Sequence, residues 1–257
     1  MISPPPFLLL AVLAGVATEG PETSRAPDAV PTAEELVERV AAMWDLPDLE
    51  LTSKMTIVRA DGTGSEADLL IRRAGAGRTR VDFLSPPKDR GKVILHVGNE
   101  SWLYLPRTGR TVAIPAKRNP MTGAVLFEDL LPGRPELADA RVEEEPDGFV
   151  LVVAGSGKSK RKSRTSRIYF SRSTLLPFRR EIHASSGRLL QTVHIDETRA
   201  WRGAEIPWDV RFVNNIRGAT EVHLEVIRVD GLAGDPEELF SRERIVPLAG
   251  EAATDEP

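Results

Sequence analysis

Residues Gly91 to Leu131 read GKVILHVGNESWLYLPRTGRTVAIPAKRNPMTGAVLFEDLL, and this stretch decides the fold. It begins with two strand-like runs that meet at the turn dipeptide Gly98-Asn99. β-branched and aromatic residues favour strands, and a two-residue turn between two such runs is typical of a hairpin. An apolar cluster follows from Val125 to Leu131. We expect a β-hairpin and then a short helix that buries Phe127, Leu130 and Leu131.

The strand pattern continues on both sides of this stretch. Before it, apolar residues alternate from Leu49 onward, interrupted by turns that contain glycine or proline. After it, six segments have strand composition: Gly148–Ala154, Ser166–Ser171, Pro177–His183, Arg188–Trp201, Glu205–Asn215 and Glu221–Val229. The intervals between strands are too short for repeated parallel crossovers through helices. The sequence therefore predicts a mainly β protein with few helices, an α+β chain built on an antiparallel meander.

A helix should open the folded part of the chain at Thr32. Thr32 and Glu35 have the spacing of a capping box, in which each side chain bonds the backbone amide of the other residue. Apolar residues then recur at helical intervals, at Leu36, Val37, Val40, Ala41 and Trp44. We expect this helix to bury the face that carries them.

Several predicted strands are apolar on both faces. The adjacent pairs are Leu69-Leu70, Ile94-Leu95 and Leu103-Tyr104. A sheet with one solvated face would alternate between apolar and polar residues, so one face should pack on the core and the other should meet helices or a cavity. A sheet covered only by short helices can exchange them for an acyl chain, because similar apolar area is buried in both states.

The N-terminus has the composition of an export signal. An apolar run from Phe7 to Ala17 has the length of a signal-peptide core and is too short to span a bilayer. No Lys or Arg precedes it, and a buried or unattached apolar segment is the alternative. We expect residues 1–17 to be a signal peptide, 18–31 a linker, 32–246 the folded domain and 247–257 a flexible tail. The mature protein would then be periplasmic and, without a cysteine at the boundary, not lipid-anchored.

The composition excludes several classes of function. The chain has 257 residues, of which 41% are hydrophobic, and this is enough for a substantial core. Its formal net charge is −4, so there is no long-range positive field to attract nucleic acid. The absence of cysteine excludes disulfides, zinc thiolates and thiol nucleophiles.

The sequence has no familiar motif for catalysis or metal binding. Its histidines, at His96, His183, His194 and His223, lie in separate strand-like segments without metal-binding spacing. There is no Gly-x-Ser-x-Gly elbow, and the stretch from Gly155 to Ser159 lacks the first glycine of a phosphate-binding loop. We therefore expect no enzyme, no cofactor and no metal, with a site built from residues distant in sequence as the alternative.

Basic residues gather between two of the predicted strands, at Lys158, Lys160, Arg161, Lys162, Arg164 and Arg167. The run contains no aromatic residue. A solvated hairpin accounts for it. The alternative is an exposed loop that touches anionic headgroups or an acidic partner, where each basic side chain would contribute at most about 1 kcal/mol and less at high salt.

The central stretch also resembles a known family, the outer-membrane lipoprotein-sorting proteins related to the periplasmic carrier LolA. Their pattern "W.YLP..R" followed by "MG…F.YEDL" is matched by Trp102-Leu103-Tyr104-Leu105-Pro106, Arg110, Met121, Gly123, Phe127, Glu128, Asp129 and Leu130. The likeness extends more loosely from Leu36 to Ile245. It departs from the pattern at Thr122, at Leu126, and where the family's aromatic before the acidic pair reads Phe127. It implies a LolA/LolB-like fold, in which a strongly curved antiparallel sheet forms an incomplete barrel covered by short helices.

The resemblance also implies a function. A protein of this family would be a periplasmic carrier or chaperone that binds lipid, or the acyl chains of lipoproteins, in an apolar cavity for outer-membrane sorting. The expected cavity and lid residues are Leu69, Ile71, Phe83, Leu95, Trp102, Tyr104, Met121, Phe127 and Leu130. The alternative for these side chains is that they only complete the core.

The partners implied by the resemblance are lipoprotein or lipid acyl chains, an inner-membrane transporter or outer-membrane acceptor, and transient contact with a membrane surface. Nucleic acid is not among them. Two other classes stay open. One is an envelope protein-interaction subunit associated with a membrane transporter, without cargo transfer, and the other is a hydrolase that acts on envelope material.

Overall fold

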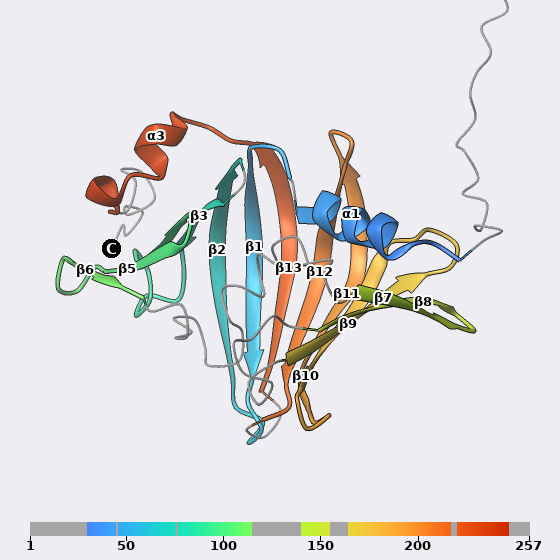
Figure 1. Cartoon of the computed structure of the whole chain (residues 1–257). Coiled ribbons are helices and arrows are strands. Elements are labelled where there is room, and N and C mark those ends of the chain that lie inside the picture. Colours follow the sequence, from blue (N-terminus) through green and yellow to red (C-terminus); the bar gives the residue numbers. More distant parts are fainter. Residues whose placement is uncertain are drawn as a thin grey trace, which may run out of the picture.

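The structure, a computed structural model, describes residues 30–44, 46–75, 77–114, 140–154, 164–216 and 220–246. In these residues thirteen strands form one antiparallel sheet (Figure 1). The strands are β1 (Leu49–Val58), β2 (Gly64–Ala74), β3 (Arg78–Phe83), β4 (Val93–Val97), β5 (Glu100–Leu105), β6 (Arg110–Ala113), β7 (Ala140–Glu145), β8 (Gly148–Ala154), β9 (Arg164–Ser171), β10 (Pro177–Ala184), β11 (Leu189–Trp201), β12 (Ala204–Asn214) and β13 (Thr220–Gly231). The prediction of a mainly β, antiparallel protein is confirmed.

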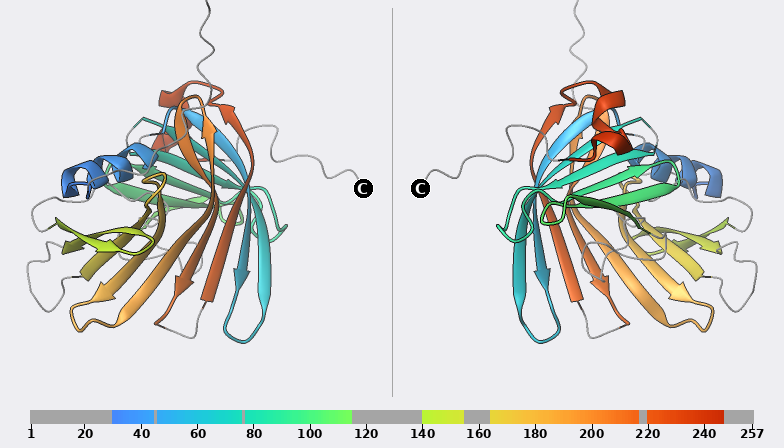
Figure 2. Two further views of the ribbon diagram at one scale, coloured as in Figure 1. Left: turned by 90° about the vertical axis from the view of Figure 1, so that its right-hand side faces the viewer. Right: turned by 90° about the vertical axis from the view of Figure 1, so that its left-hand side faces the viewer.

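Two meanders meet at the centre of the sheet. The first runs from β1 to β6, the second from β7 to β13, and β1 pairs with β13 to join them. The edges are β6 and β7, so the described sheet is not closed, and Figure 2 shows its strong curvature. The expected incomplete barrel is therefore confirmed. Residues 115–139, which connect the two edge strands and contain Met121, Phe127 and Leu130, lie outside the described residues.

Two helical segments lie on opposite faces of this sheet. Helix α1 (Ala33–Trp44) lies over β7, β8 and β12, while α3 (Pro236–Leu239) and the 3-10 helix η1 (Arg242–Arg244) lie near β3, β4 and β5 (Figure 1). We call the two sides of the sheet the α1 face and the α3 face. No helix in the described ranges is long and apolar enough to cross a membrane.

The strand register fixes which residues share a face. One row of paired residues across five strands lies on the α3 face: Trp102, Leu95, Arg80, Arg72 and Glu50. The neighbouring row points to the α1 face: Leu103, Ile94, Val81, Ile71 and Leu51. Gly98 makes the tight β4–β5 turn possible, because its φ of +61° lies in the left-handed region that a side chain disfavours.

The buried residues form separate clusters on the two faces. The largest, which we call the central cluster, covers the α1 face of β1 to β4 and β11 to β13. The α1 cluster lies beneath the helix and joins Leu36, Val37, Val40, Phe149, Leu151, Val153, Ile168 and Phe170. A further cluster on the α3 face joins Val93, Leu95 and Trp102 to the C-terminal residues Leu239, Phe240 and Ile245. Apolar residues therefore pack on both faces, as the paired apolar positions in the strands predict.

The sequence did not predict every element. Strand β6 has only four residues, and β7 reads ARVEEE, so neither shows the apolar alternation of a half-buried strand. The helices α3 and η1 are too short for a helical period. Several predicted features lie outside the described residues: the expected helix at Val125 to Leu131, residues 1–29 and 247–257, the stretch from Gly155 to Ser159 and most of the basic run. The side chain of Trp44 is also outside them.

Candidate functional site

The first turn of α1 is fixed by the predicted capping box. The Thr32 amide donates to Glu35 Oε2 at 2.6 Å, and the Glu35 amide donates to Thr32 Oγ1 at 3.2 Å. The hydrogen bond from the Thr32 amide, and next a 3.1 Å hydrogen bond that the Thr32 hydroxyl donates to Glu35 Oε2, hold the pKa of Glu35 below its ordinary value. The carboxylates of Glu34 and Glu35 also complement the positive end of the helix dipole. The start of the helix is therefore defined by side-chain chemistry.

One side of α1 is buried against the sheet. Leu36 and Val37 are fully buried, and Val40 is nearly so. They pack on the apolar residues of β8 and β9 in the α1 cluster, among which Phe149 and Phe170 are almost inaccessible to solvent. At roughly 1.5–3 kcal/mol for each fully buried aliphatic side chain, these three residues contribute roughly 5–9 kcal/mol to holding the helix in place. This is the same order as the stability of a whole domain.

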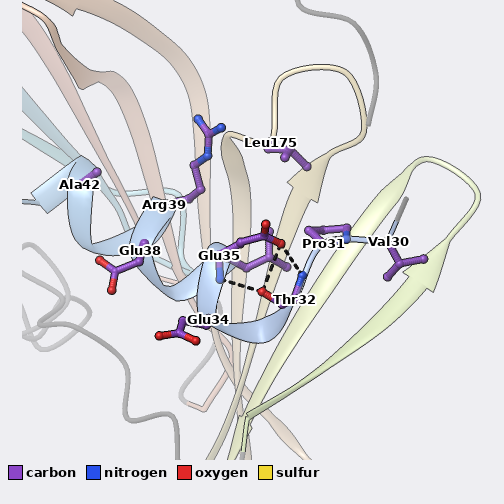
Figure 3. A pocket seen from close by; sticks show the side chains of 10 residues that line it. Val30, Pro31, Thr32, Glu34, Glu35, Glu38, Arg39, Ala42 and Leu175 are labelled. Carbon is purple, nitrogen blue, oxygen red and sulfur yellow. Dashed lines mark hydrogen bonds between the residues drawn. The ribbon is translucent and has the colours of Figure 1, made fainter. Parts of the chain in front are cut away.

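A pocket of about 880 Å³ runs along this helix (Figure 3). We call it the α1 pocket, and it is lined by Val30, Pro31, Thr32, Glu34, Glu35, Leu36, Glu38, Arg39, Ala42 and Leu175. Leu36 belongs to the α1 cluster, and Leu175 packs against that cluster from the turn between β9 and β10. The pocket therefore adjoins the apolar interface between α1 and the sheet. Its volume lies within the range of about 300–1,000 Å³ that small-molecule sites occupy.

The apolar surface continues across the sheet beyond α1. On the same face, the central cluster includes Leu69 with no exposure, Ile71 and Phe83. Trp201 and Trp208 pack against it from β11 and β12. The α1 face therefore carries apolar side chains on both meanders of the sheet.

The six predicted cavity residues that the structure describes lie on two faces. Leu69, Ile71 and Phe83 belong to the central cluster of the α1 face. Leu95, Trp102 and Tyr104 lie on the α3 face, where they pack with the C-terminal residues. These two sets are separated by the sheet and do not line one cavity. The α1 pocket residues Val30, Ala42 and Leu175 were not predicted, because a pocket at the side of a helix leaves no pattern in the sequence.

Sequence reasoning also missed a charged network on the α3 face. The fully buried guanidinium of Arg80 donates to Asp82 through two nitrogens, at 2.8 and 2.9 Å. It also donates to the carbonyl oxygens of Leu239, at 3.3 Å, and Val246, at 2.6 Å. Arg72 joins Asp82 to Glu50 with two contacts of 2.8 Å. The only signal in the sequence was the set of charged residues at alternate positions within apolar strands.

This network fastens the C-terminal segment to the sheet. At one end Glu50 accepts a 2.8 Å hydrogen bond from the Ala233 amide, and at the other end Arg80 binds two carbonyls of the segment. Buried charges are tolerated when they are paired and hydrogen-bonded, as these are. The arrangement is that of a structural clamp.

The histidines lie in separate places. His96 Nδ1 lies 2.9 Å from Ser101 Oγ, and burial lowers the pKa of His96. His183 contacts Glu181 at 3.0 Å, and His223 contacts Asp209 at 2.6 Å. The pKa of His194 is lowered mainly by burial and, to a smaller extent, by the positive charge of the nearby Arg211. Within the described ranges, no three or more His, Asp or Glu side chains are grouped so that they could hold a metal ion.

Sequence comparison identifies a family. A protein-family model whose description reads "-like: Uncharacterized protein" matches residues 75–246. The chain belongs to this family. The family match spans β3 to η1, so it includes Arg80 and Leu175 but not α1. A search of curated protein sequences found no match.

Solved structures show which fold this family member has. A LolA superfamily protein from Nitrosomonas europaea is similar with a TM-score of 0.65 at 19% identity, over 83% of this chain and 99% of the other. An outer membrane lipoprotein-sorting protein domain from Vibrio parahaemolyticus has a TM-score of 0.67 at 20% identity, over 83% of this chain and 97% of the other. A DUF1329 family protein from Desulfovibrio piger has a TM-score of 0.66 at 14% identity, over 83% of this chain and 97% of the other. The fold is therefore LolA-like, as the sequence resemblance implied.

Proposed function

We propose that this protein is a periplasmic carrier that shields the acyl chains of a lipid or a lipid-modified polypeptide from water. One observation supports the proposal most: a short helix covers an apolar sheet face, and a pocket of about 880 Å³ adjoins the covered interface. The LolA-like fold and the similarity to an outer membrane lipoprotein-sorting protein domain from Vibrio parahaemolyticus support it as well. The export-signal composition of residues 1–17 supports the periplasm as its location.

The energies of helix and guest are of the same order. Burial of Leu36, Val37 and Val40 contributes roughly 5–9 kcal/mol, and an acyl chain with about twelve buried methylenes contributes roughly 10 kcal/mol at about 0.8 kcal/mol per CH₂. A guest that enters beside α1 therefore offsets the loss of helix contacts. The exchange between α1 and the guest stays reversible, because neither the state with α1 packed on the sheet nor the state with the guest bound is strongly favoured. This is what a carrier needs, since it must also release its cargo.

The binding residues in this proposal lie on the α1 face. Leu69, Ile71 and Phe83 form the sheet surface, while Leu36 and Leu175 lie where the pocket meets the α1 cluster. Leu95, Trp102 and Tyr104 instead support the C-terminal segment on the other face. The chemistry is noncovalent, so the proposal assigns no catalytic residue, cofactor or metal. The cargo would travel toward the outer membrane.

A substitution that fills the pocket tests this function. Ala42 is exposed and lines the α1 pocket, so Ala42→Trp should occupy the space without disturbing the core. Ala60→Trp is the matched control, because Ala60 is also exposed but lies in the β1–β2 turn. We expect a fluorescent fatty acid to bind the wild-type chain and the Ala60 variant alike, and the Ala42 variant at least about tenfold more weakly.

Two results would count against the proposal. One is that folded wild-type protein neither takes up the fluorescent fatty acid nor contains lipid detectable by mass spectrometry after purification. The other is that both tryptophan variants bind the probe as the wild type does. Thermal unfolding of all three proteins establishes that a change in binding does not come from a loss of folding.

A further inference from the structure

Leu175 has a backbone conformation that leucine disfavours. Its φ is +53°, in the left-handed region where Cβ crowds the backbone and glycine is the usual residue. The turn holds this conformation through hydrogen bonds: the Leu175 amide donates to the Ser171 carbonyl at 2.9 Å, and the Ser171 amide donates to the Leu176 carbonyl at 3.1 Å. A strained residue persists only where its surroundings determine its conformation, and such residues concentrate at functional positions.

The side chain of Leu175 explains why a leucine is present. It is partly buried, packs against the α1 cluster and lines the α1 pocket across from the first turns of the helix (Figure 3). Ala33, in the first turn of α1, packs against the same cluster. A glycine would satisfy the turn but would leave this contact empty. The strain is therefore tolerated at a point where an apolar side chain meets the interface between α1 and the sheet.

We propose that Leu175 is a positioning residue that keeps α1 closed on the sheet and so sets how readily an apolar guest enters. The inference deepens the proposed carrier function and rests on it for the identity of the guest, a single acyl chain. With Leu175 in place, part of the binding energy of the guest is spent on opening the interface. Without the Leu175 side chain, α1 is open in a larger fraction of the molecules. The apparent affinity for the guest then rises by the same factor as the open fraction.

Two substitutions of Leu175 separate the effect of losing its side-chain contact from the effect of relieving its backbone strain. Leu175→Ala removes the contact and keeps a Cβ at positive φ, whereas Leu175→Gly removes the contact and relieves the strain. Arg202, at the turn between β11 and β12, is the other described non-glycine residue with positive φ, at +49°, and it does not line the α1 pocket. Arg202→Gly therefore controls for relief of backbone strain away from the α1 pocket, although it also removes the contact of the Arg202 guanidinium with the Trp201 ring, at 4.6 Å.

The experiment measures α1 opening and guest uptake in the same four proteins. Hydrogen exchange of the amides from Val37 to Met43, compared with that of β2 amides, reports opening without any ligand. Stopped-flow mixing with a fluorescent fatty acid gives kon and koff. We expect both Leu175 variants to show about three- to tenfold faster exchange in α1 and about three- to tenfold higher kon with unchanged koff, so that Kd falls by the same factor.

The controls distinguish this role from a merely structural one. Leu175→Gly should have a higher urea midpoint than Leu175→Ala, yet both should open α1 alike, because opening depends on the side chain. Arg202→Gly should leave α1 exchange and kon at wild-type values. A substitution that only weakened the fold would speed exchange in β2 as well and would not tighten binding.

The outcomes also separate this inference from the proposed function. If the wild type binds no fatty acid but the Leu175 variants exchange faster in α1, the positioning role stands and the carrier function fails. If the wild type binds and the Leu175 variants match it in α1 exchange and in kon, the positioning role is overturned while the carrier function stands.

Discussion

Arg80 and Asp82 lie two residues apart on β3 and form a bidentate ion pair that is almost completely shielded from solvent. Arg80 Nη2 lies 2.8 Å from Asp82 Oδ1, and the side chains are 0% and 4% exposed. Because the same guanidinium binds carbonyls of Leu239 and Val246, one residue connects β3 to the C-terminal segment. The α3 face is therefore closed by specific polar contacts, whereas the contacts that hold α1 on its face are largely apolar.

Replacement of Arg80 should destabilise the protein strongly. Arg80→Leu leaves Asp82 short of charge compensation and two carbonyls without their donor, so we expect a loss of about 3–5 kcal/mol in the free energy of unfolding. Arg228→Leu is the matched control, because Arg228 also pairs with a residue two positions away, Asp230, but both side chains are more than half exposed. Its expected cost is about 0–1 kcal/mol. Urea unfolding measures both, and equal costs would contradict the assigned role of Arg80.

The capping box should stabilise α1 locally. Thr32→Ala removes the acceptor for the Glu35 amide, so we expect a loss of about 0.5–2 kcal/mol, concentrated in the helix. Thr32→Ser keeps the hydroxyl and should retain most of the stability. Amide exchange at Val37 and Val40 is the direct readout, because these residues belong to the part of the helix that packs on the α1 cluster. Identical exchange in the alanine and serine variants would disprove the contribution of the cap.

Mild acid should weaken the fold through two histidines. Burial lowers the pKa of His96 and of His194 below the ordinary value of about 6.5. The unfolded chain therefore binds protons more readily than the folded one, so stability is complete above about pH 6.5 and is lost as the pH falls toward the folded values. His96→Asn with His194→Asn should reduce the drop in urea midpoint between about pH 7.5 and pH 5. A double variant with an unchanged pH profile would rule out this source of acid sensitivity.

Two core aromatics should separate the functions of the two faces. Phe83 on the α1 face and Trp102 on the α3 face are each 8% exposed, so substitution by leucine should destabilise both variants, by about 1–3 kcal/mol, and Trp102→Leu more because it removes more buried volume. Only Phe83→Leu enlarges the proposed binding surface, so only this variant should change the order of affinities for fatty acids of different length. A change in that order in the Trp102 variant alone would contradict the assignment of the faces.

Much of the fold could be predicted because local patterns were strong. The Thr32 and Glu35 spacing gave the start of α1, and the alternation around Gly98 gave the central hairpin. Strands such as β7 could not be found, since its run of three glutamates carries the charges of an edge strand and hides the apolar period. The helices α3 and η1 have contacts, such as those of Leu239 with the α3-face cluster, that only the folded chain reveals.

The candidate site could be predicted only in part. Alternation within one strand places Leu69 with Ile71, and Trp102 with Tyr104, but it does not relate one strand to the next. The pairing of Leu95 with Arg80 shows that Leu95 lies on the face of the charged network. The register between strands depends on long-range pairing, so the sequence pattern could not show that the predicted cavity residues lie on two faces. The prediction therefore placed residues from both faces in one cavity. The contribution of Leu175 was also hidden, because a positive φ at leucine cannot be read from residue type.

Tryptophan quenching by a brominated fatty acid tests most directly whether the α1 face takes up the guest. Bromine quenches only nearby indoles, and the chain has reporters on both faces: Trp208 packs on the central cluster of the α1 face, and Trp102 lies on the α3 face. In single-tryptophan variants, with the others replaced by phenylalanine, we predict saturable quenching of Trp208 and none of Trp102. Quenching of Trp102 alone, or of neither tryptophan in folded protein, would contradict the account.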